Sequence, residues 1–154
     1  MTRLSSTLVL GVGNVLMGDE GVGVHAVRAL ESDGAPPGVT VVDGGTGGFH
    51  LLSLLQEYDP VVFVDATLDG RPPGTVTLLK PRFASDFPRV LSAHDIGLRD
   101  LLESASLLGP LPRLYLFTVS VELGQDLGLE LTGPVRAALP TVLTGIRTVL
   151  ADLS

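Results

Sequence analysis

The chain has 154 residues, of which 45% are hydrophobic and 18% are charged, and its formal net charge is −7. A chain of this length and apolarity can bury a substantial core, which excludes disorder, and it has no unbroken apolar run long enough for a membrane helix. The negative net charge argues against nucleic acid or anionic lipid as a partner, because phosphate binding depends on Lys and Arg. The absence of cysteine excludes disulfides and thiolate chemistry, so a cytoplasmic protein is expected.

The first apolar stretch is expected to be a strand. Leu8–Met17 follows Arg3 and superficially resembles a signal peptide, but glycines interrupt it. The acidic pair Asp19 and Glu20 then stands where a small-residue cleavage site would be expected. We therefore predict a strand over Thr7–Val12, buried on both faces.

Helical and strand patterns then alternate along the chain. The expected elements are a helix from Val22 to Leu30, a strand over Val39–Val42, a helix over Phe49–Tyr58 and a strand over Val61–Val64. Two consecutive β-α-β units result, and their crossovers should be right-handed. If the strands lie in the order 2-1-3, the chain reverses direction between the first and third strands. Glu20 and Asp65 then face each other across this switch point, with Asp43 one strand away.

The second half of the chain continues in the same style. The expected elements are an antiparallel edge strand over Thr75–Leu79, a helix beginning near His94 and Asp95, a strand over Leu114–Val121 and a closing helix from Val135 to Leu150. Pro134 suits the first turn of the closing helix, whereas Pro140 should kink it or mark a late start. The prediction is one domain over residues 1–154 of class α/β. It is a three-layer αβα sandwich with an about five-stranded, mostly parallel twisted sheet, one antiparallel edge strand and helices on both faces.

Acidic side chains follow three of the predicted strands and define the candidate site. The carboxyl ends of parallel strands line the crevice where ligands bind, so Glu20, Asp43 and Asp65 could converge there. Together with His94, carboxylates form a mixed oxygen and nitrogen site suited to a divalent transition metal. The alternative is structural: Glu20 or Asp65 could cap a helix or balance its dipole, and Asp43 could only bond the amides of an Asp-Gly-Gly turn. In the functional interpretation Asp43 activates water or holds a substrate group.

Other readings of the motifs are weaker. A dinucleotide fingerprint would need glycine where Leu16 stands, and the acidic residues after it would repel a pyrophosphate. The chain has no Gly-x-Ser-x-Gly and no His-Glu-x-x-His motif, so serine hydrolases and ordinary zinc proteases lose their anchors. His25 and His50 do not follow a strand directly, so we expect them to be surface or packing residues.

Four short motifs occur together in the order and spacing of one known family, from about residue 8 to the region of Leu129. They are Gly11-Val12-Gly13-Asn14 running into Gly18-Asp19-Glu20-Gly21-Val22-Gly23-Val24, then Asp43-Gly44-Gly45-Thr46, Val64-Asp65-Ala66, and Ser92-Ala93-His94-Asp95-Ile96-Gly97-Leu98. In these motifs the sequence resembles the nickel-iron hydrogenase maturation endopeptidases.

The resemblance implies a cytosolic endopeptidase that removes a C-terminal extension from a hydrogenase large-subunit precursor after nickel insertion. It implies that the nickel is supplied by the substrate and serves for recognition, with the cut just beyond a Cys-x-x-Cys-x-x-His or Arg motif in the substrate. Carried over to this sequence, the nickel-contacting residues are Glu20, Asp65 and His94, and Asp43 is the aspartate proposed to be catalytic or to contact the cleavage site. Either Asp43 or the nickel would activate the water. A non-cleaving maturation chaperone and a small-molecule metal-dependent hydrolase remain as alternatives.

Overall fold

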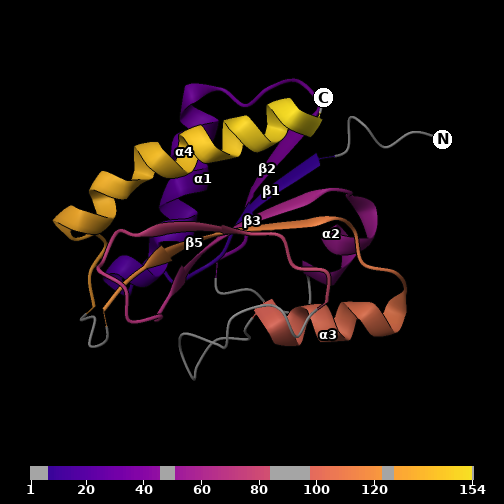
Figure 1. The fold of residues 1–154 in the computed structure, drawn as a ribbon, viewed down its shortest axis with the longest axis horizontal. Helices are drawn as coiled ribbons and strands as arrows, with labels where there is room; N and C mark the ends of the chain where they lie inside the picture. The colour runs from indigo at the N-terminus through magenta and orange to yellow at the C-terminus, as the bar shows by residue number, and fades with distance from the viewer. Residues whose placement is uncertain (1–6, 46–50, 84–97, 123–126, 154) are drawn as a thin grey trace.

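A computed structural model describes residues 7–45, 51–83, 98–122 and 127–153. Figure 1 shows a central sheet between two layers of helices. The strands are β1 (Thr7–Gly11), β2 (Val39–Asp43), β3 (Val61–Thr67), β4 (Val76–Leu79) and β5 (Leu114–Ser120). The helices are the 3₁₀ turn η1 (Gly18–Gly21), α1 (Val22–Asp33), α2 (Leu51–Glu57), α3 (Leu98–Leu108) and α4 (Gly133–Leu153).

The sheet has the order β2-β1-β3-β5-β4, and only β4 runs antiparallel to its neighbour. This confirms the predicted α/β class, the antiparallel edge strand and the 2-1-3 order of the first three strands. The chain leaves β1 for β2 on one side and returns to β3 on the other. The switch point therefore lies between the carboxyl ends of β1 and β3.

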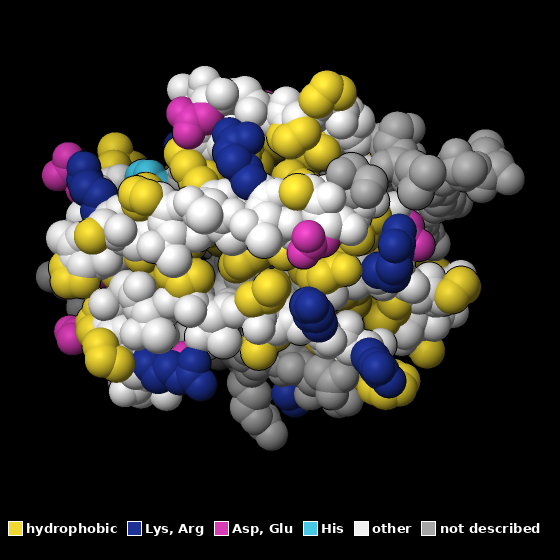
Figure 2. Space-filling view, turned by 45° about the horizontal axis from the view of Figure 1, so that its top comes forward, with side chains coloured by type: hydrophobic (Ala, Val, Ile, Leu, Met, Phe, Trp, Pro, Cys, Tyr) yellow, Lys and Arg dark blue, Asp and Glu magenta, His cyan; other side chains and the backbone are white. Residues whose placement is uncertain are grey.

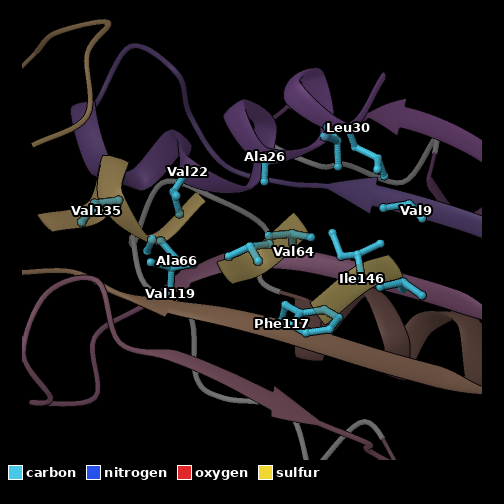
Figure 3. Close-up of a cluster of buried hydrophobic side chains, with 14 of the residues drawn as sticks. Val9, Val22, Ala26, Leu30, Val64, Ala66, Phe117, Val119, Val135 and Ile146 are labelled. Atoms are coloured by element: carbon cyan, nitrogen blue, oxygen red, sulfur yellow. The ribbon is translucent and has the colours of Figure 1, made fainter. Parts of the chain in front are cut away.

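Two apolar cores lie on opposite faces of the sheet, because successive side chains of a strand alternate between faces. In β1, Val9 belongs to the core under α1 and α4, and Leu8 and Leu10 belong to the core under α2 and α3. Figure 3 shows the first of these cores, in which Val64 and Phe117 of the sheet lie among side chains of α1 and α4. Both faces of β1 and β3 are thus covered, which explains their unbroken apolar sequences.

The third strand is longer than its apolar run predicted. The strand was predicted to end at Val64, with Asp65 just beyond it, but β3 continues to Thr67. The reason is its partner β5, which pairs with β3 as far as Thr67↔Ser120, whereas β1 stops at Gly11 opposite Val64. Asp65 therefore lies inside the strand, just after the end of its pairing with β1.

The closing helix confirms one proline prediction and corrects another. Pro134 lies in the first turn of α4, as expected, but the helix begins at Gly133 and runs through Pro140, so a late start is wrong. A proline inside a helix leaves the carbonyl four residues earlier without its backbone donor, here that of Arg136. The apolar stripe of α4 continues on both sides of Pro140, through Val135 and Ile146, and packs on the sheet. The predicted start of the preceding helix near His94 and Asp95 lies outside the described residues.

No helix among the described residues is long and apolar enough to cross a membrane. On the face drawn in Figure 2, the basic side chains of the described residues lie among acidic ones and form no continuous basic field.

Candidate active site

The loop between β1 and α1 brings Glu20 to the switch point. Glu20 lies in η1, which packs against β3, the strand that carries Asp65. The backbone amide of Val12 donates to the carbonyl of Val64 at 3.0 Å, so the chain leaving β1 stays beside β3 before it turns into η1. The predicted proximity of the Glu20 and Asp65 segments therefore has a structural basis.

Two glycines make this close approach possible. A side chain at Gly23 would collide with the carbonyl oxygens of Val64 and Val12, so only glycine lets α1 begin directly against the two strands. Gly13 has a φ of +136° and lies against the carbonyl of Glu20, where a Cβ atom has no room. The glycines of these motifs thus allow the turn that carries Glu20 to pack closely against the sheet, which explains them without a bound phosphate.

Asp19 also holds this turn in place, through hydrogen bonds with Thr132. Its side chain is only 1% exposed, and its two carboxylate oxygens accept hydrogen bonds from the amide and the hydroxyl of Thr132, each at 2.7 Å. Thr132 directly precedes α4, so the carboxylate joins the turn to the start of that helix. This role could not be predicted from the sequence, because Asp19 and Glu20 are both acidic and no local pattern decides which of the two side chains turns inward.

Asp65 is half-buried, and its carboxylate accepts a hydrogen bond from the amide of Ala66 at 2.8 Å. Strand alternation assigns it to a face of the sheet. Val64 and Ala66 belong to the core under α1 and α4, and Phe63 belongs to the opposite core. Asp65 therefore shares the face of Phe63, under α2 and α3.

Asp43 lies at the same edge of the sheet but on the other face. It is the last residue of β2, and its Oδ2 accepts hydrogen bonds from Nε and Nη2 of Arg28 in α1, at 3.2 and 2.9 Å. Its Oδ1 accepts a hydrogen bond from the amide of Gly45 at 3.0 Å, which is the bond expected of an Asp-Gly-Gly turn. The carboxylate remains 38% exposed. The structure thus separates Asp43 from Asp65, and it adds Arg28, which the sequence did not single out.

His25 packs under the segment that precedes α4. Its Nε2 is buried and has no hydrogen-bond partner among the described residues, while the backbone of Leu129 forms a hydrogen bond with the imidazole. Burial lowers the pKa of His25, and the positive charges of Arg28 and Arg136 lower it further. This fits the packing role that the sequence suggested. His50 and His94 lie outside the described residues.

The described residues contain no group of three or more His, Cys, Asp or Glu side chains placed to hold a metal ion. The predicted nickel set includes His94, which this part of the chain does not contain, so Glu20, Asp65 and His94 stay a prediction. Carboxylate oxygens with an imidazole nitrogen suit a divalent transition metal, and three ligands leave positions open for ligands from a partner.

Comparison with known proteins places this architecture in a family. The model of a hydrogenase maturation protease family, HycI, matches residues 24–148. The hydrogenase expression/formation protein HoxM of Azotobacter vinelandii is 38% identical over 151 residues, which cover 94% of this chain and 72% of that protein. The hydrogenase 2 maturation protease of Escherichia coli is 34% identical over 147 residues, covering 91% of this chain and 90% of that one.

A solved structure agrees with the sequence relatives. The hydrogenase maturating endopeptidase HybD from E. coli superposes with a TM-score of 0.83 at 32% identity, covering 96% of this chain and 93% of that one. Fold and sequence therefore point to the same group of proteins, in line with the motifs around Glu20, Asp43 and Asp65. This chain belongs to the hydrogenase maturation protease family and is a peptidase.

Proposed function

We propose that this protein is the endopeptidase that removes the C-terminal extension from a nickel-loaded hydrogenase large-subunit precursor. The observation that carries the proposal is the switch point itself, where η1, fixed by Asp19 and by close-packed glycines, packs against the strand of Asp65. Family membership supports the reaction class. A precursor in the course of maturation would be met in the cytoplasm.

In this proposal the nickel belongs to the substrate and identifies a precursor that is ready to be cut. Glu20, Asp65 and His94 would contact it, and the remaining coordination positions would be filled by the precursor. The turn that carries Glu20 is held at the two residues before it: the amide of Thr132 donates a hydrogen bond to Asp19, and the amide of Gly18 donates one to the carbonyl of Gly128. Such preorganisation lowers the entropic cost of gripping an ion that arrives with a large partner.

Cleavage adds water across a peptide bond, so one group must take a proton from the water and the new amine must gain one. Asp43 is suited to act on the bound peptide because it lies at the edge of the sheet with a partly exposed carboxylate. Arg28 fixes its orientation through Oδ2. The alternative source of an activated water is the nickel of the substrate, which can act as a Lewis acid.

The proposal is tested by mixing the purified protein with nickel-loaded precursor and measuring the mass of the precursor. We expect a loss equal to one short C-terminal peptide, and no loss with nickel-free precursor. Glu20→Gln and Asp43→Asn should each abolish the cut, whereas the matched change Glu31→Gln, at an exposed position of α1, should not.

Two other outcomes would contradict the proposal, and a third would decide which group activates the water. Binding of the precursor without any mass loss would indicate a maturation chaperone. Turnover of small amides without a protein partner would indicate a small-molecule hydrolase. If Asp43→Asn cuts at the wild-type rate while Glu20→Gln does not, Asp43 is not the base, and activation of the water passes to the nickel.

A further inference from the structure

A short segment before α4 pairs with the loop that carries Glu20. Met17 and Gly128 form a parallel bridge. The amide of Gly128 donates to the carbonyl of Leu16, and the amide of Gly18 donates to the carbonyl of Gly128, both at 2.8 Å. Residues 127–131 therefore lie side by side with the start of the turn that bears Glu20.

This pairing gathers three exposed leucines. Leu127 and Leu129 flank Gly128, and the register of the bridge places Leu127 beside Leu16 in the pairing. Their exposed fractions are 81% for Leu127, 64% for Leu129 and 55% for Leu16. We name these three residues the leucine patch.

The leucine patch is fixed in place by the residues around it. Leu131 is buried, and its carbonyl accepts a hydrogen bond from Nη2 of Arg136 at 3.4 Å. The backbone of Leu129 is hydrogen-bonded to the imidazole of His25, and the next anchor along the chain is the hydrogen bond from Thr132 to Asp19. The fold thus holds large apolar side chains in water at a defined position, although their burial would be favourable.

We propose that the leucine patch is a docking surface for the folded protein substrate, an inference that rests on the proposed function. The patch is continuous with the candidate site, since Leu16 is followed within the same loop by Asp19 and Glu20. A folded partner that brings a metal ion to Glu20 must also contact the protein surface next to Glu20. A small ligand would need a pocket, whereas outward-facing leucines suit a protein surface.

Charge narrows the chemistry of this partner. Glu130 is exposed beside Leu129, and the whole chain carries a formal net charge of −7. The basic residue of the same neighbourhood, Arg136, is held by the carbonyl of Leu131. The complementary surface is an apolar patch with a Lys or Arg opposite Glu130, because opposite charges favour binding and speed encounter. The occupant is therefore a region of the precursor next to its cleavage site, apolar at the centre and with a basic residue at its rim.

The test compares two pairs of exposed leucines. In the patch variant, Leu127→Ser and Leu129→Ser are combined. The matched control combines Leu107→Ser and Leu108→Ser, which are 87% and 59% exposed at the end of α3. The end of α3 leads into the amino end of β5, so the control lies at the opposite edge of the sheet from Glu20. Both variants should melt at the wild-type temperature, since the four side chains lie on the surface.

With nickel-loaded precursor, the patch variant should show a KM raised about tenfold and a kcat within about twofold of the wild type, because docking is lost but chemistry is not. The control should match the wild type in both constants. Equilibrium binding of the precursor, measured in parallel, should weaken by the same factor in the patch variant alone.

The outcomes separate this inference from the proposed function. An unchanged KM in the patch variant, or an equal change in both variants, overturns the docking surface while wild-type cleavage stands. A wild-type protein that sediments as a dimer, and a patch variant that sediments as a monomer, would assign the patch to a second copy of this chain and also overturn it. If the wild type binds the precursor without cutting, the endopeptidase proposal fails, and selective loss of binding in the patch variant still supports docking. If the wild type neither binds nor cuts, both proposals fail.

Discussion

Replacement of Asp19 by asparagine tests whether the buried carboxylate positions Glu20. Asparagine keeps the shape, but only one of its two terminal atoms accepts hydrogen bonds, so the amide or the hydroxyl of Thr132 loses its acceptor. A hydrogen bond to a charged group contributes about 1.5–3 kcal/mol. The lower end applies, because Thr132 is exposed and can turn its freed donor to water, and because asparagine has no charge to desolvate.

A loss of about 1.5 kcal/mol lowers the Tm of a domain of this size by about 3–6 °C. The protein remains folded at 25 °C, since native domains have about 5–15 kcal/mol of stability, so unfolding cannot reduce turnover there. A displacement of about 1 Å at a reacting group can cost about 10²-fold in rate. We therefore expect kcat/KM for nickel-loaded precursor to fall by about 10- to 100-fold at 25 °C, a loss far larger than the stability change explains.

The assay is thermal unfolding by circular dichroism together with precursor cleavage followed by mass spectrometry. Asp33→Asn, at the exposed end of α1, is the control and should change the free energy of unfolding by less than about 0.5 kcal/mol. If Asp19→Asn lowers the Tm but cleaves at the wild-type rate, Asp19 is a structural residue only. If neither property changes, the two bonds to Thr132 are of no consequence, and the reasoning from burial is refuted.

Two further predictions concern stability. Burial lowers the pKa of His25 in the folded state, so the unfolded chain binds the proton more readily. The contribution of His25 to stability should therefore be complete above the ordinary pKa of 6.5 and should be lost as the pH falls below it. The free energies of unfolding measured in urea at pH 5 and pH 7 should differ less in His25→Gln than in the wild type. Gly23→Ala should destabilise the fold by about 3 kcal/mol or more, because the added methyl group collides with the carbonyls of Val64 and Val12. The control Gly133→Ala should be neutral or slightly stabilising, because a Cβ atom there meets open space. Equal denaturant midpoints for the two variants would show that the backbone can shift at Gly23 to accept the methyl group.

The strands and their order could be predicted because the apolar runs are short, separate and bounded by turn residues. Once two β-α-β units were recognised, handed crossovers left few ways to place Glu20 and Asp65 other than at a common edge. The end of β3 could not be predicted, because it is set by β5, whose pairing carries the strand past Asp65 to Thr67. Local sequence carries no information about where a distant neighbour stops.

The contacts of the site were harder to predict for the same reason. Asp19 and Thr132 are 113 residues apart, so their bond leaves no periodic trace in the sequence. The pair of Arg28 with Asp43 joins a helix to a strand, and Arg28 has the exposed position of an ordinary surface residue. The separation of Asp43 from Asp65 onto two faces depends on strand register, which requires the observed pairing.

The separation of Asp43 from Asp65 has a consequence for the substrate in the proposed reaction. The two residues lie on β2 and β3, with β1 between them. Neighbouring strands are about 4.8 Å apart, so the backbones of β2 and β3 are about 10 Å apart, and an extended chain that runs over the carboxyl end of β1 crosses this distance in about three residues. In the substrate motif that the family resemblance implies, Cys-x-x-Cys-x-x-His or Arg, the second cysteine precedes the last residue before the cut by three positions. A nickel ion held at that cysteine could thus reach Asp65 while the bond to be cut lies near Asp43.

Two glycines inserted between this cysteine and the cut should leave precursor binding unchanged and reduce cleavage by at least about tenfold, since the bond would overshoot Asp43 by about 6–7 Å. Cleavage of the lengthened precursor at the original bond and at the original rate would show that the two carboxylates do not set this spacing.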